Sequence, residues 1–284
     1  MGKFDGCLLA CDIDGTLLYD NILPERNVSK IEYFVREGGA FSLSTGRTSL
    51  ALSDVTSKIK RISPSALSNG CVIYDFDTKS AVTEKTLSKK ALSMVERVVK
   101  TVDIGIEMHT ANDLFVPRRS AASDLHEEYE SMTARFVDAA SAVKENVNKV
   151  IYFLENDSQE QALLQIAKDY ENECVFYRTG TTIGGVAQRY LEQIPGGVSK
   201  ASALIELCGL LHIKEGGFFA IGDFYNDVEM LKAADISAAL CDSPDEVKKA
   251  ATVVVGHAAD GAVADFIEYL ERNLENGQSN QTLP

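Results

Sequence analysis

Segments of strand length alternate with segments of helical periodicity at both ends of this 284-residue chain, and no other feature restricts its fold as strongly. Early in the chain, strands are predicted over 6–13 and 40–45, and helices over 24–38 and 48–59. From Ser199 the alternation returns. Alternating strands and helices form parallel sheets covered by helices on both faces. The two ends of the chain therefore predict one doubly wound, Rossmann-like α/β core.

The later segments complete this core. Helices are predicted over 199–209, 226–234, from about Pro244, and over 261–272, and strands over 217–221, 236–240 and 252–255. Residues 275–284 form a polar tail that we expect to fray.

The middle of the chain has a different pattern, in which strands pair around helices. Helices are predicted over 88–102, 121–131 and 158–170, with strands over 104–109, 114–117 and 149–154 and two short strands up to Ile194. This pattern is typical of α+β domains. We therefore expect a core domain made of residues 1–85 and 189–284, interrupted by an inserted α+β domain at residues 86–188.

The charge balance restricts the partners of the protein. The chain holds 28 Lys and Arg against 42 Asp and Glu, a net charge of −14, and its acidic residues are spread along the sequence. Nucleic acids are bound by clustered Lys and Arg, so we expect no nucleic-acid partner. A phosphorylated ligand would need a local cationic site, which a metal ion can provide.

Cysteine usage and the apolar segments argue against other classes of protein. The six cysteines include no C-x-x-C pair and the four histidines stand far apart, so the sequence does not predict a zinc site. No stretch approaches 18 consecutive apolar residues, and the N-terminus lacks the pattern of a signal peptide. We therefore expect a cytoplasmic protein without a membrane partner.

Four short polar segments follow predicted strands, and open α/β sheets bind ligands beyond the carboxyl ends of their strands. The first segment is DIDGT at residues 12–16. Strand side chains at i and i+2 point the same way, so Asp12 and Asp14 can address one ligand while Gly15 lets the backbone turn closely past it. Asp-Gly also closes strands in ordinary turns, so this segment indicates a binding site only in combination with the other segments.

The second and third segments carry groups that can bind phosphate. In STGR at residues 44–47, a hydroxyl and backbone N–H groups can hold phosphate oxygens, and Arg47 can clamp them or stay solvated. Lys200 stands just inside a predicted helix, where its charge opposes the helix dipole and calls for an anionic partner. A capping turn and a surface lysine are the plainer interpretations of these two segments.

The fourth segment is GDFYND at residues 222–227, directly after the predicted strand 217–221. Carboxylates at a strand end suit Mg²⁺, which prefers hard oxygen ligands. Asn226 or Asp227 could also cap the next helix. Because all four segments stand at strand ends, together they predict a site for phosphate and a metal ion.

With these segments the chain resembles the haloacid dehalogenase-like hydrolases, whose four motifs match residues 12–16, Thr45, Lys200 and 222–227. The segments TGR at 45–47 and SNG at 68–70, with the large insert before Lys200, are similar to the Cof-type branch, subfamily IIB, with a type C2B cap. The resemblance spans nearly the whole chain, densely at both ends and loosely in the insert.

The resemblance implies a Mg²⁺-dependent phosphatase that acts on a small phosphorylated metabolite, by default a sugar phosphate. Asp12 would attack phosphorus to form an aspartyl-phosphate, and Asp14 would serve as acid and then base. Thr45 and Lys200 would hold the transferring phosphoryl group. The implied metal ligands are Asp12, Asp14 through its backbone carbonyl, Asp223 and, from close by, Asp227. The implied substrate-binding residues are Gly15, Thr16, Gly46, Arg47, Asn69 and Asn226.

Two segments depart from the pattern of the family. Where Cof-type chains often have Gly-Asn-Ala, this chain has Cys-Asp-Ser at 241–243, and His257 replaces an asparagine near the last helix. Both departures leave the four motifs intact but affect the expected hydrogen bonding of the site. His257 is either a donor behind the site or a plain loop histidine.

Two other classes of function are alternatives to a phosphatase. A phosphomutase or other phosphotransferase would use the same aspartyl-phosphate chemistry, but the segment TGR favours a phosphatase because the mutase relatives carry a different second motif. A purely regulatory binding module would require loss of a catalytic group, and each group is present. The substrate, the oligomeric state and the insert residues that contact the substrate stay open; the candidates in the insert are His109, Arg118, Arg119 and Arg178.

Overall fold

The computed structural model describes residues 2–183 and 185–279, and the chain divides into two compact units. The core unit comprises the chain up to Gly46, Ser53–Lys79 and the chain from Ser199 onward. The insert unit comprises Arg47–Leu52 and Ser80–Val198. The main segment of the insert unit begins six residues before the predicted boundary at 85/86 and ends ten residues after the one at 188/189, and the unit also takes in Arg47–Leu52.

Five strands form the sheet of the core unit, in the order β14-β13-β12-β1-β2. They are β1 (Leu8–Cys11), β2 (Ala40–Leu43), β12 (Phe218–Gly222), β13 (Ile236–Leu240) and β14 (Val253–Val255). Each neighbouring pair is parallel, so all five carboxyl ends meet at one edge of the sheet. The predicted parallel α/β core is confirmed.

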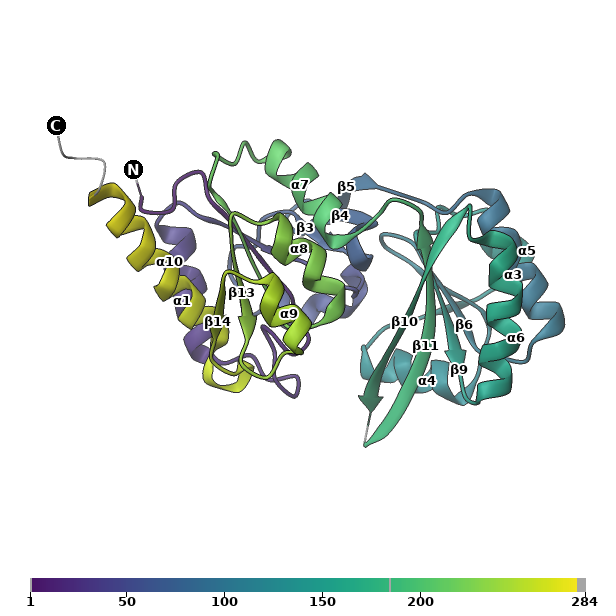
Figure 1. Ribbon diagram of the computed structural model, residues 1–284. Helices are drawn as coiled ribbons and strands as arrows, with labels where there is room; N and C mark the ends of the chain where they lie inside the picture. The colour runs from purple at the N-terminus through teal and green to yellow at the C-terminus, as the bar shows by residue number, and fades with distance from the viewer. Residues whose placement is uncertain (1, 184, 280–284) are drawn as a thin grey trace. The chain divides into compact units, whose positions relative to one another are not determined.

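Helices cover both faces of the core sheet, as Figure 1 shows. They are α1 (Glu25–Arg36), α7 (Lys200–Leu210), α8 (Val228–Ala233), α9 (Asp245–Ala250) and α10 (Ala262–Ser279). Leu8 and Ala10 of β1 pack against α7, α8 and α9. Because side chains alternate along a strand, Leu9 and Cys11 point to the opposite face, where α1 and α10 pack together. Burial on both faces explains why these strands are almost entirely apolar.

Parts of the core unit differ from the prediction. In place of one helix over 48–59, the structure has a 3₁₀ turn, η1 (Ser49–Leu52, assigned to the insert unit), and a short helix, α2 (Ser53–Thr56). The hydroxyls of Thr56 and Ser57 donate to the carbonyls of Ser53 and Asp54, at 3.3 and 3.1 Å, and such local bonds compete with a continuous helix.

Further elements of the core unit were not predicted. An antiparallel pair, β3 (Ser65–Leu67) and β4 (Val72–Asp75), is joined by the 3₁₀ turn η2 (Ser68–Gly70). The 3₁₀ turns η4 (Tyr225–Asp227) and η5 (Ala258–Asp260) precede α8 and α10. The expected frayed tail is wrong over 275–279, which belong to α10, while 280–284 lie outside the described residues.

The insert unit holds a second sheet, with strands in the order β10-β11-β9-β6-β7-β8. The strands are β6 (Ile106–His109), β7 (Leu114–Arg118), β8 (Arg135–Phe136), β9 (Lys149–Leu154), β10 (Cys174–Ile183) and β11 (Val186–Pro195), and β5 (Ser80–Glu84) begins the unit's main segment. The prediction of two short strands up to Ile194 is wrong, because β10 and β11 form an antiparallel hairpin of 10-residue strands.

The helices of the insert unit divide between the two faces of its sheet (Figure 1). They are α3 (Lys89–Thr101), α4 (Ala121–Tyr129), α5 (Ala139–Ala142), α6 (Asp157–Ala167) and the 3₁₀ turn η3 (Lys168–Tyr170). Ile106 and Met108 of β6 pack among α3, α5 and α6. Phe153 and Tyr190 pack near Ala122 of α4 on the other face. Among the described residues of both units, no helix is long and apolar enough to span a bilayer.

Candidate active site

Asp12 is the first residue after β1 and is buried at the carboxyl edge of the core sheet. Its backbone N–H donates to the carbonyl of Ile221 on the neighbouring strand at 3.0 Å. The parallel pairing with β12 therefore continues one residue past the strand and fixes the backbone position of Asp12.

Lys200 begins α7, and its side chain is 1% exposed. Ser199 caps the helix through a capping box with Ser202. The ammonium lies 2.5 Å from Asp12 Oδ1 and 2.6 Å from Asp227 Oδ1, so it bridges two buried carboxylates from different strand ends. Burial alone would lower the pKa of Lys200, but the two carboxylates together raise it above its usual value.

Asp223 and Asp227 follow β12 and have different partners. Asp227 Oδ2 accepts the backbone N–H groups of Asp223 and Phe224, at 3.0 and 3.1 Å. Its side chain makes no bond to the first turn of α8, so it does not cap that helix. Thr16 donates its hydroxyl to Asp223 Oδ1 at 2.6 Å, which connects the first and fourth sequence segments.

The site carries an excess of negative charge. Asp12, Asp223 and Asp227 each place one carboxylate oxygen within 4.8 Å of the others. Burial, with the charge of Asp227, raises the pKa of Asp12 well above its usual range, although Lys200 opposes this. Burial also raises the pKa of Asp223 to about 6. Both shifts express the cost of placing three carboxylates beside one ammonium away from water.

This donor set fits a divalent cation. Mg²⁺ takes oxygen ligands, keeps several waters and uses one or two carboxylates, and its charge would offset the excess of acid. Of the four acidic residues assigned to a metal, the structure brings together the carboxylates of Asp12, Asp223 and Asp227. The side chain of Asp14 is exposed and is not part of this group.

Two glycines allow the carboxylates to approach this closely. Gly15 has φ +84°, and a Cβ at this position would lie 2.6 Å from Asp223 Oδ2. A Cβ at Gly222 would lie 2.5 Å from Asp227 Cγ. Real Cβ contacts are longer, so any side chain at either position would displace an acidic group.

The second segment lies at the carboxyl end of β2, next to β1. Thr45 is buried, and its backbone N–H donates to the carbonyl of Ala66 at 2.9 Å. Asn69 has a left-handed φ of 56°, and its backbone N–H donates to the carbonyl of Thr45 at 2.9 Å. A Cβ at Gly46 would lie 3.3 Å from the Asn69 amide. Residues 45, 46 and 69 therefore form one small turn cluster.

Two predicted substrate-binding residues have other surroundings. Arg47 belongs to the insert unit, where its guanidinium lies 3.6 Å from the Glu130 carboxylate and donates to the carbonyl of Ala51 at 3.4 Å. Asn226 is exposed on η4.

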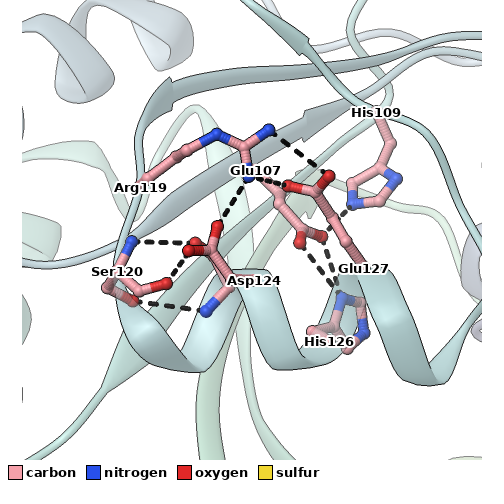
Figure 2. Close-up of polar contacts among 8 residues, drawn as sticks. Glu107, His109, Arg119, Ser120, Asp124, His126 and Glu127 are labelled. Atoms are coloured by element: carbon pink, nitrogen blue, oxygen red, sulfur yellow. Dashed lines mark hydrogen bonds and ion pairs between the residues drawn. The ribbon is translucent and has the colours of Figure 1, made fainter.

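The arginines proposed as insert contacts are engaged within the insert unit. Arg118 donates to the carbonyls of Val99 and Val102 near the end of α3, at 2.5 and 2.7 Å. Figure 2 shows Arg119 directed at Asp124 and Glu127 of α4, at 2.6 and 2.9 Å. Arg178 lies 2.8 Å from Glu160. Each of the three arginines is therefore engaged by hydrogen bonds or ion pairs within the insert unit.

His109 is the candidate with a different environment. Its Nε2 lies 3.1 Å from Glu107 Oε2, and the Nδ1 of His126 on α4 lies 3.0 Å from the same oxygen (Figure 2). All three side chains are buried, and His109 Nδ1 has no hydrogen-bond partner among the described residues. Burial would raise the pKa of Glu107, but the bonds with the two histidines outweigh it and lower the pKa to about 2.

Sequence reasoning missed Glu107 and His126, missed Tyr19, whose ring centroid lies 4.8 Å from that of His257, and did not pair Asp242 with His257. The available signal for Glu107 was the alternation of apolar and polar residues in IEMH at 106–109, which is typical of a strand with one polar face. No local signal connects Asp242 with His257, whose Nε2 lies 3.1 Å from Asp242 Oδ2.

The sequence matches the haloacid dehalogenase-like hydrolase family over residues 9–267. It is 24% identical over 273 residues to the pyridoxal phosphate phosphatase YbhA of Escherichia coli, covering 92% of this chain and 97% of that protein. A haloacid dehalogenase-like hydrolase from Bacteroides thetaiotaomicron has a similar structure, with TM-score 0.82, 20% identity, and coverage of 93% and 99% of the two chains.

A sugar phosphatase of subclass IIB is also similar in structure, with TM-score 0.77, 17% identity, and coverage of 93% and 98% of the two chains. The match over residues 9–267 includes Asp12, Thr45 and Asp223, which follow strands of the core sheet, and Lys200, which begins α7. The chain therefore belongs to the haloacid dehalogenase-like hydrolases, with the fold of their Cof-type subclass IIB.

Proposed function

We propose that this protein is a phosphatase that hydrolyses the phosphate ester of a small metabolite, with Asp12 as the nucleophile. One observation carries the proposal: the Lys200 ammonium lies 2.5 Å from Asp12 Oδ1, in a buried position at the carboxyl edge of the sheet. A carboxylate approaches a phosphate dianion only if a cation reduces their mutual repulsion. Membership of a hydrolase family and a relative named as a phosphatase support the same reaction.

In the proposed reaction, Asp12 attacks phosphorus and forms an aspartyl-phosphate, and the ester oxygen leaves with a proton from Asp14. Asp14 then takes a proton from the water that attacks the aspartyl-phosphate and releases inorganic phosphate. The exposure of Asp14, two residues after buried Asp12, suits a group that exchanges protons with substrate and water. Covalent catalysis divides one difficult step into two easier ones.

The remaining groups would hold the phosphoryl oxygens. We assign this role to the Thr45 hydroxyl, to Lys200 and to the backbone N–H group of Gly46, with Asn69 supporting the turn. The N–H groups of Gly15 and Thr16 donate to the carbonyls of Leu18 and Ile13, so these two residues would shape the loop that surrounds the phosphate. Phosphate-ester hydrolysis can require accelerations of up to ~10²¹, of which acid–base catalysis supplies roughly 10²–10⁴. Positioning and cationic groups therefore have to supply most of the remainder.

We also propose Mg²⁺ as the cofactor, held by Asp12, Asp223, the Asp14 carbonyl and, from close by, Asp227. When bound, it would neutralise the phosphoryl oxygens and the excess of carboxylate. Support comes from three carboxylate oxygens within 4.8 Å of one another and from the raised pKa values of Asp12 and Asp223. Arg47 and Asn226 are assigned to the substrate by the family pattern alone.

For the substrate we propose a sugar phosphate or a similar phosphorylated metabolite, recognised by the insert. The structurally similar subclass IIB protein is a sugar phosphatase, and the Escherichia coli relative acts on pyridoxal phosphate. Both names describe small phosphate esters. A panel of such esters, ranked by kcat/KM with Mg²⁺ present, tests the proposal; a lack of turnover across the panel would contradict it.

A phosphomutase or other phosphotransferase is the alternative with the same covalent intermediate. The two reactions differ in the fate of the phosphoryl group, which goes to water in one case and to an acceptor hydroxyl in the other. Release of inorganic phosphate is therefore measured first without an acceptor sugar and then with one. Transfer to the sugar with negligible release would replace the phosphatase assignment.

A further inference from the structure

Polar residues follow the carboxyl ends of the core strands in one row. His257 follows β14, Asp242 follows β13, Asp223 follows β12, and Asp12 follows β1. The row therefore continues past Asp223 across β13 and β14. Neighbouring strands in a sheet lie about 4.8 Å apart. Asp242 and His257 stand where the sequence departs from the usual residues of the family, and in the structure they are in contact.

The imidazole of His257 is held through both nitrogens. Nδ1 accepts the backbone N–H of Ala259 at 3.1 Å, and Nε2 lies 3.1 Å from Asp242 Oδ2. Because Nδ1 is an acceptor, the ring proton is on Nε2 and is donated to Asp242. These two contacts therefore fix the orientation of the imidazole ring.

The ring of Tyr19 packs against this imidazole. The two ring centroids lie 4.8 Å apart with an interplanar angle of 69°, an edge-to-face contact. Tyr19 and Ile22 exchange backbone hydrogen bonds of 3.0 and 2.8 Å around Asp20 and Asn21, whose φ values are 48° and 60°. Two left-handed residues in a row form the tight type I′ turn of a two-residue hairpin.

The hairpin is directly connected to Asp14. Leu18, which precedes Tyr19, donates its N–H to the carbonyl of Ile13 at 2.8 Å and accepts the N–H of Gly15 at 3.1 Å. Asp14 lies between these two bonded residues. A displacement of the hairpin would therefore pass to the Asp14 backbone through a few short hydrogen bonds.

We propose that His257, held by Asp242, anchors the Tyr19 hairpin and thereby positions the Asp14 carboxylate for proton transfer to the leaving oxygen. His257 is then a positioning residue that touches neither substrate nor reacting atoms. The inference rests on the proposed role of Asp14 as the acid of the phosphatase reaction. It assigns one shared purpose to the two departures from the family pattern.

The first test measures amide hydrogen exchange of residues 15–23 in His257→Ala, Asp242→Ala and Tyr19→Leu. Each variant should increase this exchange several-fold, because the opening of a loop is governed by its local contacts. His212→Asn is the matched control, since His212 is exposed in the same unit and has a φ of 53° that asparagine tolerates. Unchanged exchange in His257→Ala would overturn the anchoring.

The second test compares two leaving groups. An alkyl ester, such as the most active sugar phosphate, needs a proton on its leaving oxygen, whereas para-nitrophenol leaves without one. His257→Ala should lower kcat/KM roughly tenfold for the sugar phosphate, as expected for a slightly misplaced group, and much less for para-nitrophenyl phosphate. Equal losses for both esters would indicate a general structural effect and overturn the positioning of Asp14.

A double-mutant cycle completes the test. Asp242→Ala combined with His257→Ala should lower kcat/KM no further than His257→Ala alone, because both act through one contact. If the loss of kcat/KM in the double variant equals the product of the two single losses, Asp242 and His257 do not act through one contact. If Asp14→Asn retains wild-type turnover, the proposed role of Asp14 is wrong. The anchoring of the hairpin is tested independently of that role, because the hydrogen-exchange measurement needs no substrate.

Discussion

At the scale of single residues, the site depends on how closely charged groups are held. Asp12, Asp227 and the Lys200 ammonium meet with distances of 2.5 and 2.6 Å in a buried position. Ion pairs of this kind are costly to desolvate and are seldom retained for stability alone. The arrangement therefore agrees with the proposed role of Asp12 as the nucleophile.

Asp12→Asn should abolish turnover and leave the fold intact. The amide keeps the shape of the side chain but cannot form the acyl phosphate, so kcat should fall by on the order of 10⁴–10⁶-fold. The melting temperature should not decrease, because burial already disfavours the charged form of Asp12. Near-normal phosphate release by this variant would refute the nucleophile assignment; Asp77→Asn, in the exposed turn after β4, is the control.

Gly15→Ala should destabilise the protein and reduce activity together. The left-handed backbone at φ +84° costs about 1 kcal/mol for alanine, and its Cβ would displace the Asp223 carboxylate. Gly216→Ala separates the two effects, because Gly216 has φ +74° and no atom within 4 Å of the added Cβ. Denaturant unfolding should show a loss in both variants, whereas activity should fall only in Gly15→Ala.

At the scale of secondary-structure elements, the carboxyl ends of parallel strands bring distant segments together. β1 lies between β12 and β2 in the sheet, although β12 is some two hundred residues away in the chain. Sequence periodicity predicted these strands because burial on both faces requires apolar runs. It did not predict the pair β3 and β4, whose short strands carry too few residues to show a period.

On the insert, α4 and β6 are connected by the buried carboxylate of Glu107. His126→Ala would leave this carboxylate with one partner fewer and should destabilise the insert by roughly 3–5 kcal/mol. Glu107→Gln/His126→Ala should recover part of this loss, because the neutral amide needs no cationic or donating partner. Thermal unfolding of the full chain measures the stability of both variants. Equal losses of stability in the single and the double variant would contradict the pairing of Glu107 with His126.

The same carboxylate predicts how the stability of the insert depends on pH. The pKa of Glu107 is lowered from 4.5 to about 2 in the folded state, so its contribution is complete above about pH 4.5 and is lost as the pH falls toward 2. Burial lowers the pKa of His109, which acts in the same direction at somewhat higher pH. Glu107→Gln should therefore flatten the acid limb of the stability curve, and an unchanged limb would contradict this assignment.

At the scale of the whole molecule, the proposed cation should stabilise the fold as well as activate it. Binding to the folded state alone contributes about 2.7 kcal/mol when the Mg²⁺ concentration is about 100 times Kd. The melting temperature should rise with Mg²⁺ in the wild-type protein but not in Asp12→Asn/Asp223→Asn. EDTA should abolish activity and added Mg²⁺ should restore it; turnover that is independent of metal would exclude the proposed cofactor.

The overall charge of −14 sets the context for this site. An acidic protein repels phosphate dianions at long range, so the attraction has to come from the few cations at the strand ends. Lys200 supplies one buried positive charge, and the proposed metal would supply the rest. The proposed phosphate-binding site is therefore compatible with the net negative charge of the protein.

The sequence by itself determined the parallel core and the identity of the acidic, hydroxyl and lysine groups at its strand ends, because hydrophobic periodicity and turn residues are local properties of the chain. Only the tertiary structure decided which of these groups meet. Lys200 bridges Asp12 and Asp227, and His257 pairs with Asp242, because strand order and helix packing bring them together. Such partnerships depend on contacts between segments far apart in the chain, and no local pattern records them.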